Sequence, residues 1–190
     1  MLFDDGAIRW GTDGPREVAE GFDMASRAEN IYAWVRQVRG GVLGGALVVE
    51  REISAAVTIY ILRERGENQS VVEAFGAVWD ALGFERRINA ALVVAGHLME
   101  EEEVKSFRGD LTELRLMRNA MAHNPFWHEP QIDGDGRVCE LVPMVMRGKH
   151  PLPLTTPLVE GMNALVPDLI ERSRGLKEAA RLVAYSHDTD

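Results

Sequence analysis

Apolar residues recur along most of this chain at intervals of three and four positions, the spacing of one face of an α-helix. Ile31, Trp34, Val35 and Val38, for example, share such a face. Glycines, prolines and polar clusters interrupt the pattern and mark where helices end. The pattern predicts a bundle of about five or six helices, over residues 17–39, 42–65, 70–82, 84–100, 102–123 and 156–185.

Two pairs of glycines lie in the first part of this pattern. Gly40-Gly41 is predicted to separate the helix over 17–39 from the helix over 42–65. Gly44 and Gly45 follow near the start of the second helix, and no Gly-Lys-Ser or Gly-Lys-Thr sequence comes after them. Close approach of another helix therefore explains this second pair better than a phosphate-binding loop does.

The helical pattern stops at Pro125, because the residue before a proline avoids helical geometry. Asp133-Gly-Asp-Gly has the composition of a turn, and apolar residues from Val138 to Val145 indicate an extended segment after it. Pro143 cannot donate to a sheet ladder, so we expect it at a sheet edge. Residues 126–155 are therefore predicted to form a small β-hairpin arm, inserted before the last helix.

The length and composition support a single domain, or one domain with an appendage. A chain of 190 residues, 46% of them hydrophobic, can bury a core of its own. We expect a flexible N-terminus over residues 1–15 and one helical domain over 16–190, with a core at about 42–124 that the helix over 156–185 completes. No run approaches the roughly 18 apolar residues of a membrane span. Cys139 is the only cysteine, so a disulfide framework is excluded and a cytoplasmic setting is expected.

The charge of the chain is unevenly distributed. Its formal net charge is −9, which argues against broad nucleic-acid binding. Residues 1–103 carry a net charge of −8, whereas residues 104–150 carry +1. An anion-binding site is therefore predicted in the middle third of the chain.

One helix in this middle third places a charged residue among apolar ones. Val104, Phe107, Leu111, Leu114, Arg118 and Met121 follow one another at steps of three and four, as along a core-facing seam. A guanidinium group in such a seam is costly unless it is paired or faces a cleft or interface. Arg118 is therefore a candidate functional residue.

Two further polar residues follow Arg118 on the same helix. At about 100° and 1.5 Å per residue, His123 lies about 140° around the helix from Arg118 and 7.5 Å along it, and Asn119 lies between them. One helix thus spreads the three side chains over an arc, but two copies related by a twofold axis could converge on a shared cleft. His128 and His150 flank the predicted arm and are best interpreted as exposed loop histidines.

The sequence Arg118-Asn119-x-x-x-His123 resembles the signature of HEPN domains (higher eukaryotes and prokaryotes nucleotide-binding). These are up-and-down helical bundles marked by an arginine, usually followed by a polar residue, and a histidine four to six positions after the arginine. Many are dimeric, metal-independent endoribonucleases, and others bind nucleotides or act as partner proteins in toxin–antitoxin and defence systems. The resemblance differs at Pro125, where one toxin branch usually has a tyrosine.

The resemblance implies transesterification of RNA, with attack of the 2′-hydroxyl on the adjacent phosphodiester. His123 would act as general acid or base, Arg118 would hold the phosphate, and Asn119 would orient the reacting group. Neither a metal nor another cofactor is implied. The resemblance also implies a homodimer, with the motif near its interface.

Two other interpretations remain open. The first is a non-catalytic binding or partner module, which the net charge of −9 favours because a dimer would double that charge and repel long RNA. The second is a purely structural helical protein in which Arg118 forms an internal ion pair.

Overall fold

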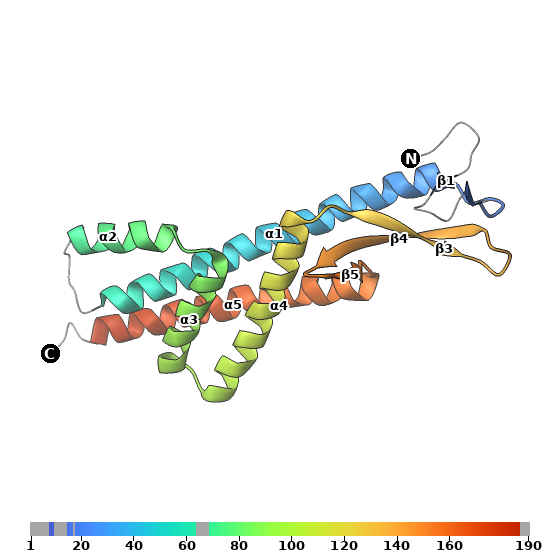
Figure 1. Cartoon of the computed structure of the whole chain (residues 1–190). Helices are drawn as coiled ribbons and strands as arrows, with labels where there is room; N and C mark the ends of the chain where they lie inside the picture. Colours follow the sequence, from blue (N-terminus) through green and yellow to red (C-terminus); the bar gives the residue numbers. More distant parts are fainter. Residues whose placement is uncertain (1–7, 10–14, 17, 64–68, 187–190) are drawn as a thin grey trace.

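A computed structural model describes residues 8–9, 15–16, 18–63 and 69–186 of the chain. Within these ranges the protein is mainly helical, as predicted, and carries a small antiparallel sheet (Figure 1). The helices are α1 (Met24–Leu62), α2 (Gln69–Asp80), α3 (Phe84–Leu98), α4 (Glu101–His123) and α5 (Thr156–Ser186).

The long helix α1 corrects the predicted break at Gly40-Gly41. It runs unbroken from Met24 to Leu62, and neither glycine adopts a positive φ. Each glycine inside a helix costs only about 1 kcal/mol relative to alanine. The apolar residues that α1 buries on both sides of the pair, from Val35 to Val49, outweigh that cost. The helix also begins later than predicted, because Asp23 caps it by accepting a hydrogen bond from Ser26 N at 3.1 Å.

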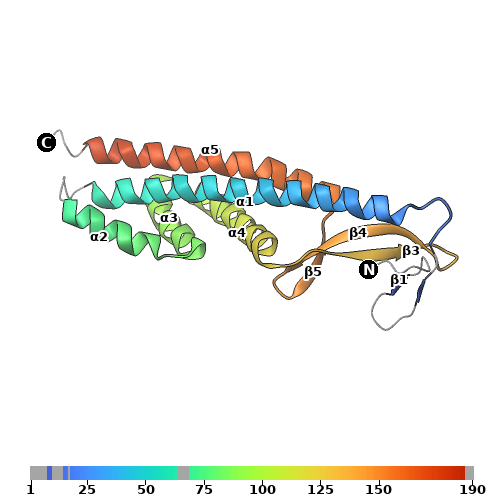
Figure 2. The ribbon, with the colours of Figure 1, turned by 90° about the horizontal axis from the view of Figure 1, so that it is seen from above.

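The helices are arranged around the pair formed by α1 and α5. Figures 1 and 2 show these two helices lying side by side along the length of the molecule, while α3 and α4 cross the pair on one side. This crossing differs from a simple up-and-down arrangement. The core lies where the crossing helices meet the pair, and its largest fully buried side chains include Ile53, Phe107, Leu111, Leu114 and Leu169.

Gly45 allows α1 and α5 to approach each other closely. A Cβ atom at position 45 would overlap Cγ1 of Val166 on α5 and lie 3.4 Å from its Cβ, whereas a Cβ at Gly44 would meet no atom within 4 Å. The predicted close approach is therefore confirmed at Gly45 and wrong at Gly44.

We expect the substitutions Gly45→Ala and Gly44→Ala to change stability in opposite directions. Gly44→Ala should raise the free energy of unfolding by about 0.5–1 kcal/mol, through helix propensity alone. Gly45→Ala should lower it by about 1–3 kcal/mol, because Val166 has a stiff branched side chain and the helices must separate. Urea unfolding followed by circular dichroism measures both. Equal stabilisation by the two substitutions would contradict the close approach.

A buried ion pair also joins α1 and α5. Glu52 is only 5% exposed, and its carboxylate accepts hydrogen bonds from Lys177 on α5 and from Arg51 at 3.2 Å. The bond from Lys177 lowers the pKa of Glu52 below its usual value, against the opposing effect of burial. Glu52 is therefore held as a charged group inside the helix interface.

The predicted hairpin arm is a three-stranded antiparallel sheet. Strands β3 (Trp127–Ile132) and β4 (Val138–Arg147) form the expected hairpin, and β5 (His150–Pro153) adds to the other side of β4. The sheet extends from the end of α4 along the N-terminal part of α1 (Figure 2).

Pro143 lies in the central strand of this sheet and not in an edge strand. The pairing of β4 with β5 ends at Met144, however, so at Pro143 the strand has β3 as its only strand neighbour among the described residues. The carbonyl of Pro143 accepts a hydrogen bond from Leu154 N at 2.8 Å. The proline lacks a backbone N–H, but it lies beyond the last residue of β4 that pairs with β5, so no hydrogen bond between these strands is lost.

The described residues before α1 form a second, two-stranded sheet and one bridge to the three-stranded sheet. β1 (Ile8–Arg9) pairs with β2 (Pro15–Arg16), and Val18 bridges to Val138 at the start of β4. Most of the predicted flexible N-terminus, residues 1–15, lies outside the described residues. In the described part of the chain, no helix combines the length and apolar character needed to cross a bilayer.

Candidate functional site

The candidate residues lie on the last turns of α4, which is fixed at both ends. At its start, the side chain of Glu103 accepts a hydrogen bond from Glu100 N at 3.3 Å, as part of a capping box. Beyond its end, Asn124 Nδ2 donates to the carbonyl of Met146 on β4 at 3.0 Å. The last turn of α4 is thereby tied to the sheet.

The core-facing seam of α4 passes beside Arg118 and not through it. Met117 is buried with 1% exposure, and Leu114 and Met121 on either side of it are fully buried. Arg118 is half-buried at the margin of this seam. The predicted seam is therefore wrong at this position. After Leu114 the buried face continues three residues on, at Met117, and not four residues on, at Arg118.

Arg118 nevertheless has no carboxylate partner among the described residues. Its Nη1 donates to Oδ1 of Asn119 at 3.2 Å, and its guanidinium lies 5.9 Å from the ring centroid of Phe84. No described Asp or Glu lies within ion-pair distance of it. An internal ion pair, one of the alternatives for this residue, is therefore not formed within the described part of the chain.

Asn119 and His123 are exposed on the same two turns. Asn119 uses its amide oxygen for Arg118, which leaves its amide N–H groups to solvent or a ligand. His123 is the last residue of α4, and its side chain makes no hydrogen bond or ion pair with any described residue. The three residues thus form an open polar arc at the end of a helix.

The sequence pattern missed a fourth residue at this helix end. Arg39 on α1 is half-buried and donates from Nη2 to the carbonyl of Ala122 at 3.1 Å. Its guanidinium lies 5.8 Å from the ring centroid of Phe126. The contact joins residues that lie 83 positions apart in the sequence. A local sequence pattern therefore could not predict it.

The two histidines that flank the arm have different surroundings. His128 lies half-buried on β3, against the ring of Tyr32 at a centroid distance of 5.1 Å, and burial lowers the pKa of its imidazole. His150 is exposed at the start of β5. Both histidines are predicted to be exposed in loops. His150 is exposed as predicted, although it lies in a strand, whereas the prediction is wrong for His128.

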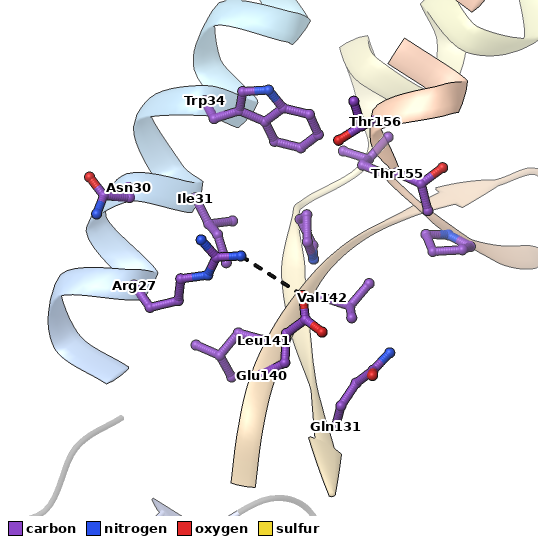
Figure 3. Close-up of a pocket in the computed structure, with 13 residues that line it drawn as sticks. Arg27, Asn30, Ile31, Trp34, Gln131, Glu140, Leu141, Val142, Thr155 and Thr156 are labelled. Atoms are coloured by element: carbon purple, nitrogen blue, oxygen red, sulfur yellow. Dashed lines mark ion pairs between the residues drawn. The ribbon is translucent and has the colours of Figure 1, made fainter. Parts of the chain in front are cut away.

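A groove of about 680 Å³ lies away from these residues, between α1, β4 and the start of α5. Figure 3 shows Arg27 and Trp34 projecting from α1 toward β4 and the residues Thr155 and Thr156. Arg27 pairs there with Glu140 at 3.8 Å. None of Arg118, Asn119 or His123 lines this groove.

The described residues contain no group of three or more His, Cys, Asp or Glu side chains that could hold a metal ion. The chemistry available at the end of α4 is therefore that of an imidazole, an amide and two guanidinium groups. Comparison with protein-family models, with curated proteins and with solved structures finds no match for the chain.

Proposed function

We propose that the chain is a HEPN-like, metal-independent endoribonuclease of the cytoplasm that works in a toxin or defence system. The observation that carries the proposal is the half-buried guanidinium of Arg118, which has no carboxylate partner among the described residues, followed on the same helix by an exposed His123. A cation that no described carboxylate neutralises is available for an external anion, such as a phosphodiester.

The proposed reaction is transesterification within the RNA. His123 removes the proton of the 2′-hydroxyl, and the 2′-oxygen attacks the adjacent phosphorus. The bond from phosphorus to the 5′-oxygen breaks, and that oxygen takes up a proton as it leaves. The products are a 2′,3′-cyclic phosphate and a 5′-hydroxyl end. Arg118 stabilises the charge that develops on the phosphate oxygens, and Asn119 orients the reacting group.

The arc of side chains supports a proposed homodimer with the motif near its interface. On one copy, Arg118 and His123 point in directions about 140° apart, which is a poor geometry for a single phosphate. A twofold axis near the end of α4 would bring the Arg118 of one copy toward the His123 of the other. Two histidines would then be present, one to remove a proton and one to supply it.

Cleavage of RNA in EDTA tests this function. We expect the purified protein to cut unstructured RNA with the metal chelated and to leave cyclic phosphate and 5′-hydroxyl ends. The same sequence as 2′-O-methyl RNA should remain intact, because it lacks the attacking hydroxyl. Cleavage of the 2′-O-methyl RNA, or products with 5′-phosphate ends, would contradict this mechanism.

A non-catalytic binding or partner module is the second candidate function. The net charge of −9 favours it, since long-range repulsion opposes the binding of extended RNA. Binding of the 2′-O-methyl RNA without cleavage of the natural RNA would favour this alternative.

A further inference from the structure

Arg39 and Arg118 differ from four other half-buried arginines in how their charge is balanced. Arg87, Arg115, Arg147 and Arg172 each form an ion pair with a carboxylate on another element. Arg39 and Arg118, also half-buried, form none with the described residues and make no further hydrogen bond or ring contact with them beyond those given above. In a chain with 30 acidic residues and 21 basic ones, two such guanidinium groups require an explanation.

The two guanidinium groups are held in the same way. Each lies near one aromatic ring, Arg39 at 5.8 Å from the centroid of Phe126 and Arg118 at 5.9 Å from that of Phe84. Each donates to one uncharged oxygen, Arg39 to the carbonyl of Ala122 and Arg118 to the amide of Asn119. A guanidinium has five N–H donors, so most remain unused in both cases.

Both groups are attached to the same part of α4. Arg118 belongs to the helix, and Arg39 binds it at Ala122, four residues further on. Four residues correspond to about 40° around the helix and 6 Å along it, so the two attachment points are neighbours on one face. The end of a helix carries about half a negative charge on its free carbonyl groups, which repels anions. Arg39 offsets this charge at Ala122.

We propose that Arg39 and Arg118 together bind one phosphate group of RNA, with Arg39 as a substrate-binding residue outside the Arg118–His123 motif. This inference rests on the proposed function and deepens it by adding a second cation. Two forked donors attached to neighbouring positions of α4 could together supply several hydrogen bonds to the oxygens of a phosphodiester. In the proposed homodimer, the bound phosphate would lie near the His123 of the other copy.

Binding of a short, single-stranded 2′-O-methyl RNA tests this inference without any cleavage. We expect Arg39→Gln and Arg118→Gln each to weaken the affinity about tenfold, the effect of losing one charge-assisted hydrogen bond. The double variant should lose less than the product of the two effects, because the residues share one phosphate. Arg36→Gln is the matched control, since Arg36 is exposed on α1 one turn before Arg39 and should change the affinity less than twofold.

The outcomes separate this inference from the proposed function. If Arg39→Gln binds as the natural protein does while Arg118→Gln binds weakly, the role of Arg39 is wrong and the proposed function stands. If the natural protein does not bind the RNA, both are wrong. Arg39→Lys guards against a folding effect, because it retains a donor for Ala122 and a charge but not the fork. We expect it to fold like the natural protein and to bind about threefold more weakly, and unchanged binding would overturn the bidentate contact.

Discussion

Replacing Lys177 with methionine is expected to lower the free energy of unfolding by about 3 kcal/mol, because it leaves the charged Glu52 inside the interface of α1 and α5 with only Arg51 as a partner. Glu52 is 5% exposed, and the side chain of Lys177 is 19% exposed. Arg51 also reaches the carboxylate, but its side chain is 72% exposed and remains largely in water. It therefore compensates the charge of Glu52 less well than Lys177 does. Urea unfolding followed by circular dichroism gives the measurement.

Two controls make this expectation specific. Arg181→Met removes a cation from the same helix, but its partner Glu178 is exposed, so the cost should be about 0.5 kcal/mol or less. The double variant Glu52→Met with Lys177→Met should recover most of the loss, since two apolar side chains replace a buried ion pair at little cost. A loss below about 1 kcal/mol for Lys177→Met would show that water reaches Glu52.

The helices of this protein could be predicted from the sequence because their signals are local. The end of α4 follows from Pro125, and the start of α3 follows from Gly83, which the structure shows as its N-cap. The error at Gly40-Gly41 has a different origin. Local propensity disfavours a helix there, and only the packing of α1 against the rest of the core, which no local pattern contains, overcomes it.

The seam of α4 shows a second limit of sequence patterns. Steps of three and of four residues both remain on one helical face, so after Leu114 the seam could continue through Met117 or Arg118. The structure buries the apolar residue of the two. Arg118 remains a candidate for another reason: no described carboxylate pairs with it, and this is a property of the tertiary structure.

Long-range contacts account for what the sequence did not predict. Strand β5 has the sequence His-Pro-Leu-Pro, which carries no strand signal of its own and forms only because β4 is beside it. Arg39 likewise gains its role from a carbonyl on α4. In both cases the partner lies on another element, and only the fold brings the two together.

The largest effect on activity is expected from His123→Ala. Removing a general acid or base should lower the rate of RNA cleavage by about 10²–10⁴-fold, and Arg118→Ala should lower it by about 10²–10³-fold through lost charge stabilisation. Neither substitution should lower the free energy of unfolding by more than about 1 kcal/mol, because His123 is exposed and Arg118 makes no ion pair with a described residue. Cleavage in EDTA under single-turnover conditions measures the rate.

His150→Ala is the matched control, since His150 is also exposed but lies at the start of β5 and outside the motif. It should leave the rate within a factor of about two, the scatter expected of a surface substitution. Activity that survives both His123→Ala and Arg118→Ala would place the chemistry elsewhere on the protein or in a contaminant. Loss in His123→Ala with unchanged RNA affinity, against loss of affinity in Arg118→Ala, would separate proton transfer by the imidazole from phosphate binding by the guanidinium.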